Sequence, residues 1–463
     1  MDIRPFAPAF DVPRRCQPIG RRARALLSAA LALCLLCTLP AGCDSKPSPS
    51  SAAAAATAAP ASATTGVSTA ASSAAPISGS ATAATTASPT TPITASANTS
   101  AATVATQPAD PRASVRAALT SGKIAALYKT TLDSLFSRVN ADGYLQESVT
   151  GLYKGEYVRS IGALVRLALE VGQEEAAARA LRFVTDVVKR HGLPYLPFTI
   201  SADGKTVRRE DEIDGRAHFV LGWALYALHG ARTAYEDDTY ALMAREMDAF
   251  FSDQYFDESV APAGGLVRNR RFTHTRDNSR AGYWDCYDLL TNHFVAAAAE
   301  QMIAVARRRG DVAAADRWTV QLAQLAEGIR TGLTRQSGGV TVYREMLVPT
   351  STGVTAENRM SWVCLSPPAA GWSGMDAAVM ANTERTAAQA LRRRSADGTW
   401  YLAVEQTGEG KVKDWVLGKA VGWDIDAARA AGNWTRIAEW FAFLEGNHAS
   451  SLYMETMKKS TGK

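Results

Sequence analysis

The chain has 463 residues, with 50 Lys and Arg against 45 Asp and Glu, and a formal net charge of +5. Seven of the basic and four of the acidic residues precede Pro111, which leaves a net charge of +2 for residues 111–463. A nearly neutral balance argues against a nucleic-acid-binding protein, which presents a basic face to its ligand.

The N-terminus has the pattern of an export signal. Five arginines in residues 14–24 precede an apolar run of 15 residues at 25–39, which is too short for a membrane span. The small residues Ala41 and Gly42 before Cys43 resemble a bacterial lipobox, in which the cysteine is lipidated. We therefore expect lipidation of Cys43; the alternative is an ordinary signal peptide cleaved nearby.

A segment without charge follows the signal. Between Lys46 and Asp110 no residue is charged, and Ala, Ser, Thr and Pro fill nearly every position. Such a segment buries too few apolar side chains to offset its ordering entropy. The sequence thus predicts a signal peptide at 1–43, a disordered linker at 44–110 and one domain at 111–463. It also predicts an exported protein, periplasmic or at the cell surface, attached to a membrane through its lipid anchor.

Two cysteines remain in the predicted domain. Cys286 and Cys364 could form a disulfide or be two buried thiols, and their apolar, aromatic surroundings favour thiols. No Cys or His pair has the spacing of metal ligands, so we expect neither a metal nor a cofactor.

The domain reads as helices almost throughout. Apolar residues at helical spacing, with continuous helical stretches, predict helices near 124–139, 157–171, 174–190, 215–229, 236–255, 285–309, 318–333, 374–393, 415–431 and 434–445. No segment shows sustained period-two alternation, and Gly339–Tyr343 is interpreted as a loop or hairpin.

The connections between these helices are unequal. Gly172, Gly310 and Gly432 each end one helix just before the next begins, which indicates tight antiparallel hairpins. The other connections, such as 256–284 and 334–373, are long and rich in Gly, Arg and aromatic residues, as is 394–414. This pattern predicts an all-α (α/α)6 toroid with the long loops around a cleft at one end. The alternative is an open helical solenoid.

One long loop holds a carboxyl among arginines and aromatic rings. Asp277 is flanked by Arg276 and Arg280, with Tyr283 and Trp284 close behind. Desolvation by the rings would raise the pKa of this carboxyl, as a general acid needs, whereas the arginines would lower it. The alternative for Asp277 is an Asx-turn or a helix N-cap.

A family resemblance enters at this loop. Its motifs are Asp277-Asn278-Ser279-Arg280, Tyr283-Trp284-Asp285 and Asp288-Leu289-Leu290-Thr291-Asn292. They resemble the acid-bearing segment of the six-hairpin glycosidases, the group of processing α-glucosidase and mannosylglycerate hydrolase. The resemblance implies Asp277 as catalytic acid, an inverting mechanism and an α-linked glucoside or mannoside as substrate.

The same resemblance implies a glutamate as base. Glu455 is followed by Thr461-Gly462, which is similar to the family's Glu and Thr-Gly turn. Glu405, followed by Thr407-Gly408, is the rival candidate. For either residue the alternative is a solvated surface carboxylate.

Further residues are predicted to contact sugar. Asp214 and Arg216 stand at the head of an inner helix, and His218 on that helix is expected to be a hydrogen-bonded core residue. Sugar rings stack on aromatic side chains. The remaining candidates lie in loops or near loop–helix junctions: His274, Arg280, Trp284, Trp372, Trp415, Trp423 and His448.

These features predict a glycoside hydrolase that acts on an oligo- or polysaccharide without a cofactor. The same toroid also hosts polysaccharide lyases and sugar epimerases, which use Tyr or His as base. A carbohydrate-binding lipoprotein without catalysis is the third reading. About ten helices are predicted where a closed toroid has twelve, so either the sequence is cut short or the ring closes with the helix near 124–139.

Overall fold

The computed structural model describes residues 110–147, 155–261, 264–273, 283–408, 410–448 and 456–457. Of Trp284 only the backbone is described. Five residues singled out above lie outside the described residues, and the predictions for them are not addressed by the structure: Cys43, His274, Asp277, Arg280 and Glu455.

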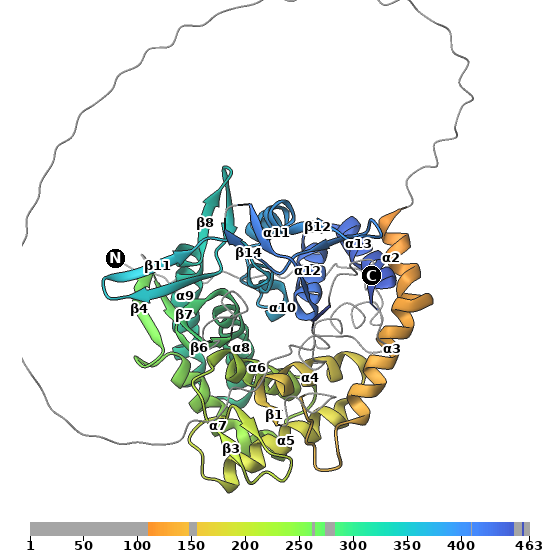
Figure 1. Ribbon diagram of the computed structural model, residues 1–463. Helices are drawn as coiled ribbons and strands as arrows, with labels where there is room; N and C mark the ends of the chain where they lie inside the picture. The colour runs from red at the N-terminus through yellow and green to blue at the C-terminus, as the bar shows by residue number, and fades with distance from the viewer. Residues whose placement is uncertain are drawn as a thin grey trace, which may run out of the picture. The chain divides into compact units, whose positions relative to one another are not determined.

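Helices dominate the described chain and form successive antiparallel pairs (Figure 1). The pairs are α4 (Val158–Val171) with α5 (Glu174–Arg190), α6 (Ile213–His229) with α7 (Ala234–Phe250), α8 (Leu289–Arg309) with α9 (Val312–Gly332), α10 (Pro367–Ala370) with α11 (Ala377–Leu391), and α12 (Gly418–Ala430) with α13 (Trp434–Asn447). Two helices precede them, α2 (Pro111–Thr120) and α3 (Gly122–Ser137).

The first helix of each pair lies on the inside. Helix α4 packs on α6, α6 on α8, and α10 contacts both α8 and α12. Helix α8 is apolar and long enough to cross a membrane by composition, but it is mostly buried in the protein, as a core helix is. The second helices α5, α7, α9 and α13 each pack on their partners, whereas α11 packs on α12. The described residues therefore form an α/α toroid, as predicted.

Helices α4 and α6 approach each other unusually closely. Gly162 of α4 lies against the backbone of His218 on α6, and Gly222 of α6 lies against Gly162. A Cβ atom at Gly162 would overlap the carbonyl group of His218. The two glycines are therefore required for this spacing between inner helices.

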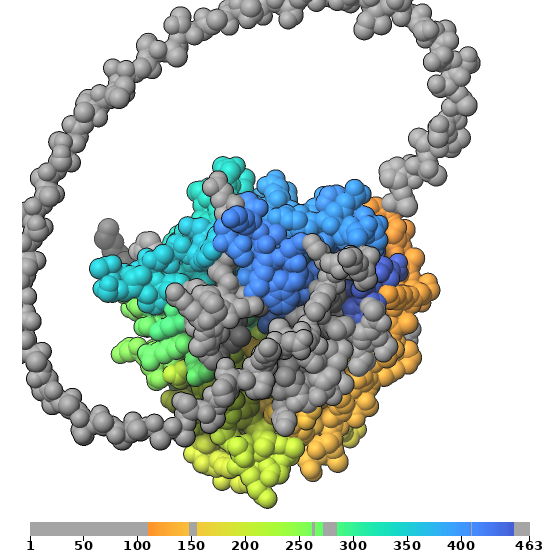
Figure 2. Space-filling view, viewed as in Figure 1, coloured from red at the N-terminus to blue at the C-terminus, as the bar shows by residue number. Residues whose placement is uncertain are grey.

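The ring closes with the N-terminal helices of the domain. Both α2 and α3 pack against α13, and Lys123 Nζ donates to the carbonyl oxygen of Glu445 at 2.7 Å. On its other side Tyr128 of α3 lies near Glu170 of α4. Burial and the charge of Glu170 raise the pKa of Tyr128 to about 12. Figure 2 shows α2 and α3 in orange along one side, from the blue region around α13 to the yellow region of α4 and α5. With them, the described residues contain twelve α-helices.

The tight turns lie at the end of the toroid where the inner helices finish. Gly172, Gly310 and Gly432 have φ angles of 76°, 78° and 70°, the left-handed conformation that glycine adopts without strain. The side chains of Asp311 and Asn433 then accept backbone N–H groups of the next helix. The predicted hairpin turns are confirmed.

The long connections at the other end carry short strands of two to six residues. These are β1 (Glu156–Tyr157), β2 (Thr199–Ile200), β3 (Val207–Arg208), β4 (Phe256–Ala261), β5 (Gly264–Val267), β6 (Asn269–Thr273), β7 (Tyr283–Asp288), β8 (Thr334–Ser337), β9 (Val340–Tyr343), β10 (Met346–Thr350), β11 (Gly353–Glu357), β12 (Arg392–Arg394), β13 (Trp400–Leu402), β14 (Glu405–Gly408), β15 (Lys411–Lys413), β16 (Val416–Leu417) and β17 (Thr456–Met457). Strands β8 and β9 form the hairpin predicted around Gly339–Tyr343. The other strands were not predicted: most have two to four residues, and no sustained alternation marks the five- and six-residue strands.

Two local expectations are resolved by these strands and their neighbours. The helix expected from residue 285 begins only at Leu289, because residues 283–288 pair with β6 and β10 in a four-stranded sheet. Cys286 in β7 and Cys364 in the 3-10 helix η1 (Trp362–Leu365) are both buried, and neither forms a disulfide. The interpretation as buried thiols is confirmed.

Candidate functional site

The inner helices all begin at the end of the toroid that carries the long connections. Because the tight turns follow their C-termini, the N-termini of α4, α6, α8 and α12 share this loop end. A group of polar side chains lies there, which we call the inner-helix cluster: Arg159, Glu212, Asp214, Asn269, Asp288 and Thr291.

Arg159 is the cation of the cluster. Its Nη1 lies 3.2 Å from Glu212 Oε1 and 3.1 Å from Asp214 Oδ2, which joins the start of α4 to the start of α6. The Arg159 side chain keeps 18% of its surface exposed, against 3% and 1% for the two carboxylates. Arg159 is therefore the member of this trio that a ligand can reach.

Asn269 extends the cluster to α8. Its Nδ2 donates to Asp214 Oδ1 at 2.9 Å and to Thr291 Oγ1 at 3.0 Å. Thr291 Oγ1 in turn donates to Asp288 Oδ2 at 2.6 Å, while Asp288 Oδ1 accepts the N–H of Thr291 as the N-cap of α8. The starts of three inner helices are thus joined by one buried hydrogen-bonded network.

Two carboxyls of the cluster have raised pKa values. Burial and the charge of Asp214 raise the pKa of Glu212 to about 8, although Arg159 opposes the shift. Burial and Asp214 also raise the pKa of Asp288 to about 7, against hydrogen bonds from Thr291 that lower it. A carboxyl that is still protonated at neutral pH can donate a proton to a substrate.

Aromatic rings lie beside the start of α12. Trp362 stacks on Trp423 with ring centroids 4.9 Å apart and planes 28° apart. Lys419 Nζ lies 4.6 Å from the centroid of a Trp362 ring, and its charge also acts on Glu212. Trp423 was predicted to stack on sugar; the structure buries it to 2% exposure against Trp362.

Glu405, one of the two candidate bases, begins strand β14. It is fully buried, forms a bridge to Ser361 and lies 3.7 Å from Lys413 Nζ. The alternative of a solvated surface carboxylate is therefore wrong for Glu405.

Asp214 and Arg216 were predicted together but face different surroundings. Asp214 is in the inner-helix cluster, whereas Arg216 Nη2 lies 2.6 Å from Glu246 Oε2 of the outer helix α7. Residues two apart project to opposite sides of a helix, so one sequence motif serves two sites.

Two further aromatic candidates lie at separate places. Trp372 is 8% exposed and lines a pocket of about 690 Å³ with residues of α9 and α11, and its ring centroid lies 5.6 Å from that of His293. Trp415 is half-buried beside Lys413, whose Nζ is 5.2 Å from its ring.

His448 and His218 are both buried, and His448 more deeply than expected for a ligand contact. His448 is 2% exposed at the C-terminal end of α13, where its N–H donates to Leu444. His218 stacks on Phe294 at 3.6 Å and is a core residue, as predicted. Neither of its ring nitrogens has a hydrogen-bond partner among the described residues, so the expected hydrogen bond is absent there. Burial and nearby arginines lower the pKa of His218 well below its usual range.

Several residues of the site were not predicted from sequence, namely Arg159, Glu212, Asn269, Trp362 and Lys419. For Glu212 a signal existed, since it stands two positions before Asp214 at a predicted helix start. Arg159 and Asn269 have none, because each is 55 residues from Asp214. Among the described residues, no group of three or more His, Cys, Asp or Glu side chains could hold a metal ion.

Comparison with known proteins gives structural likenesses only. No family model matches the chain, and no curated protein matches it. A bacterial glucoamylase complexed with acarbose is similar over 69% of this chain and 47% of its own, at 13% identity and a TM-score of 0.49. A wild-type glycosidase is similar over 71% of this chain and 85% of its own, at 13% identity and a TM-score of 0.48. Cellobiose 2-epimerase from Spirochaeta thermophila is similar over 77% and 93%, at 13% identity and a TM-score of 0.49. The chain thus spans less than half the length of the glucoamylase.

Proposed function

We propose that this protein is a carbohydrate-active enzyme, specifically an inverting glycoside hydrolase for an α-linked glycoside. The observation that supports it is the inner-helix cluster, in which buried carboxyls with raised pKa values adjoin the reachable cation Arg159. Catalysis is assigned to Asp277 as acid, with Glu455 as base and Glu405 as the alternative base.

The position of Asp277 in the chain supports its role. Asn269 and Asp288, at the two ends of the β6–β7 hairpin, belong to the cluster, and Thr273 pairs with Tyr283 at its far end. Asp277 is four residues from Thr273, a reach of up to about 14 Å. Strand β6 covers a similar distance, about 13 Å for four steps. The hairpin loop is therefore long enough to return Asp277 to the cluster.

The pairing of β16 and β17 supports Glu455. Thr456, the residue after Glu455, pairs with Leu417, which is the N-cap of α12. Lys419 and the Trp362 ring lie at the same helix start. Glu405 is a weaker candidate for activating water, because it is fully buried beside Lys413. In an inverting enzyme the acid and base carboxyls are roughly 6.5–9.5 Å apart, with water between the base and the sugar.

The test uses the mature protein on a panel of α-glucosides and α-mannosides, with the first anomer formed identified by proton NMR. Asp277→Asn and Glu455→Gln should each lower kcat by about 10²–10⁴-fold, the usual contribution of a general acid or base. Asp253→Asn and Glu258→Gln, exposed carboxylates of the 251–261 segment, are the matched controls. If Glu455→Gln keeps full activity, the base role passes to Glu405 and Glu405→Gln must be inactive; a product of retained configuration contradicts the inverting mechanism.

A sugar epimerase or polysaccharide lyase is the second candidate, and His218 favours it. Its imidazole is neutral because its pKa is lowered, and its two nitrogens have no partner among the described residues. A neutral imidazole can remove a proton beside a sugar carbonyl or carboxylate. Incubation of free disaccharides in D2O distinguishes this candidate: an epimerase incorporates deuterium at the sugar carbon it inverts and loses this exchange in His218→Asn, whereas a glycosidase releases monosaccharide.

Export and anchoring at Cys43 complete the proposal, supported by the apolar run and small residues before this cysteine. The protein should fractionate with membranes and incorporate labelled fatty acid. Cys43→Ser should abolish the label; retention of the label in that variant would contradict lipidation at Cys43.

A further inference from the structure

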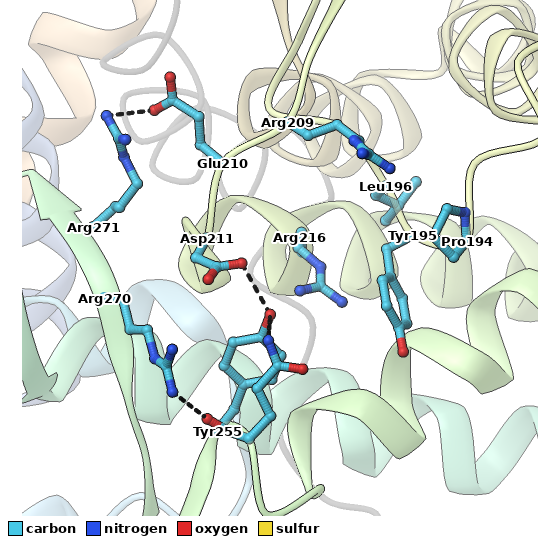
Figure 3. A pocket seen from close by; sticks show the side chains of 11 residues that line it. Pro194, Tyr195, Leu196, Arg209, Glu210, Asp211, Arg216, Tyr255, Arg270 and Arg271 are labelled. Carbon is cyan, nitrogen blue, oxygen red and sulfur yellow. Dashed lines mark hydrogen bonds and ion pairs between the residues drawn. The ribbon is translucent and has the colours of Figure 1, made fainter.

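A polar pocket of about 460 Å³, distinct from the inner-helix cluster, lies between the connection that precedes α6 and the connection that follows α7 (Figure 3). Its lining is rich in arginine and tyrosine. The charged members are Arg209, Glu210, Asp211, Arg216, Arg270 and Arg271. Four arginines against two carboxylates give this lining a positive balance.

Two of these arginines are already neutralised by partners. Arg271 Nη2 lies 2.6 Å from Glu210 Oε2, and Arg216 pairs with Glu246 behind the pocket. Arg209 is exposed, and among the described residues its side chain has no ion pair or hydrogen bond. Arg270 is also exposed, and within the described part of the chain its one hydrogen bond is to the carbonyl oxygen of Gln254, at 3.2 Å. Arg209 and Arg270 therefore offer charge to a ligand.

Two tyrosine rings, those of Tyr195 and Tyr255, also line the pocket. The guanidinium carbon of Arg216 lies 4.8 Å from the centroid of the Tyr195 ring and 5.5 Å from that of Tyr255. The Tyr255 hydroxyl donates to Asp211 at 2.9 Å, which fixes the ring. Rigid aromatic rings beside cations suit a ligand that has both an apolar face and an anionic group.

The pocket adjoins the inner-helix cluster through two shared segments. Asp211 lines the pocket and the next residue, Glu212, belongs to the cluster; Arg270 lines the pocket and the preceding residue, Asn269, belongs to the cluster. The pocket and the cluster are therefore neighbours that share the segments 211–212 and 269–270.

We propose that this pocket binds an anionic sugar unit, a carboxylate or a sulfate ester on a saccharide, with Arg209 and Arg270 as the cations that contact it. The substrate class is then an acidic saccharide rather than a neutral one. This inference rests on the carbohydrate part of the proposed function but not on hydrolysis.

The test is calorimetric binding by the full mature protein to four probes: trigalacturonate, sulfated maltotriose, unmodified maltotriose and inorganic phosphate. At least one acidic saccharide should bind about tenfold or more tightly than maltotriose and phosphate, because a hydrogen bond to a charged group is worth at least that factor. If trigalacturonate binds and sulfated maltotriose does not, the recognised group is a carboxylate. If only sulfated maltotriose binds, the recognised group is a sulfate ester. Equal binding of maltotriose, or binding of phosphate alone, overturns the proposal.

Variants locate the site. Arg209→Gln and Arg270→Gln should each lower the affinity for the acidic saccharide about tenfold. Asp211→Asn removes a charge that repels the anion, so it should raise this affinity. Arg307→Gln, at the exposed turn end of α8, is the matched control and should change nothing. Unchanged affinity in both Arg209→Gln and Arg270→Gln contradicts the assignment.

The two proposals can fail separately. Asp277→Asn should bind the acidic saccharide as tightly as the natural sequence does. If acidic saccharides bind but no saccharide is cleaved, the hydrolase proposal fails and the proposed binding site stands. If saccharides are cleaved without any preference for acidic ones, the hydrolase proposal stands and the proposed binding site fails.

Discussion

Arg159 Nη1 on α4 lies 3.1 Å from Asp214 Oδ2 on α6, and this ion pair is nearly buried. It joins two inner helices at the end of the toroid where the long connections meet. Arg159 also faces Glu212, so a single guanidinium serves two carboxyls. The stability of the fold and the charge of the candidate site therefore depend on the same residue.

Replacing Arg159 should destabilise the protein strongly. Arg159→Met removes the cation that faces two buried carboxyls, and breaking a buried pair in this way costs about 3–5 kcal/mol. The free energy of unfolding in urea measures the effect. Arg179→Met is the control, since Arg179 pairs with the exposed Glu175 one helical turn away and such pairs contribute about 0.5 kcal/mol or less. Equal losses in the two variants would contradict a structural role for the Arg159 pairs.

Stability should fall as the pH rises from about 6.5 to 8. The pKa of Glu212 is raised to about 8, and those of Asp288 and Asp424 to about 7. The folded protein holds these protons in a range where unfolded Glu and Asp, with pKa values near 4, have lost them. Unfolding therefore releases protons and becomes easier at higher pH, by about 1.4 kcal/mol per pH unit for each group still protonated.

Unfolding free energies at pH 6.5, 7.25 and 8 measure this slope. Glu212→Gln keeps a neutral side chain and should flatten it, while Glu258→Gln on exposed β4 should leave it unchanged. Below pH 6.5 the buried His218 and His293, whose pKa values are lowered, act in the opposite direction, because unfolding lets them bind protons. A slope that Glu212→Gln leaves intact would show that Glu212 is not one of these groups.

Gly162 should tolerate no side chain. A methyl group there would overlap the backbone of His218 and Phe219, so Gly162→Ala must force α4 and α6 apart. Overpacking of this kind costs about 1–3 kcal/mol or more. Gly230→Ala is the matched control, because nothing lies within 4 Å of a Cβ at Gly230 and its φ of −138° suits alanine. Thermal unfolding of the two variants should separate them clearly; a Gly162→Ala protein as stable as Gly230→Ala contradicts the close packing.

Both thiols of the domain should be unreactive toward thiol reagents in the native protein. Cys286 and Cys364 are buried, and burial raises the pKa of the Cys286 thiol, so neither presents a thiolate. A chromogenic disulfide reagent should react with them only after unfolding in guanidinium chloride. Unchanged stability after addition of a reducing agent is the companion result; reaction in the native state at the rate of a free thiol would contradict the burial.

The helices were predictable because the sequence features that define them, apolar spacing and glycine at the turns, act over a few neighbouring residues. Apolar spacing marked 174–190, which α5 covers with the same bounds, and glycine marked the turns after α4 and α8. Apart from the hairpin of β8 and β9, the strands were not predicted, and neither was the four-residue helix α10, since elements of this length are stabilised by partners distant in sequence. Strand β7, for instance, pairs with β6 and also with β10, about sixty residues further on.

The candidate site was predictable only in part. Asp214 was chosen for its place at a helix start, and it does lie in the cluster. Nothing local distinguishes Asp214 from Arg216. In the structure Arg216 pairs with Glu246 of the outer helix α7 and lines the polar pocket beside the cluster. Likewise Trp423, near a loop–helix junction as expected, became a core residue against Trp362. The residues assigned to catalysis, Asp277 and Glu455, lie outside the described residues and stay predictions.

The sequence by itself determined that the domain is made of helical hairpins with short turns at one end and long connections at the other. Those properties follow from apolar periodicity and from glycine's backbone freedom, which act within a few residues. Only the tertiary structure decided that α2 and α3 close the ring, that Arg159 faces Glu212 and Asp214, and that burial raises the pKa values of Glu212 and Asp288. Burial and charge proximity depend on which helices pack together, and that packing brings together residues that are far apart in the chain.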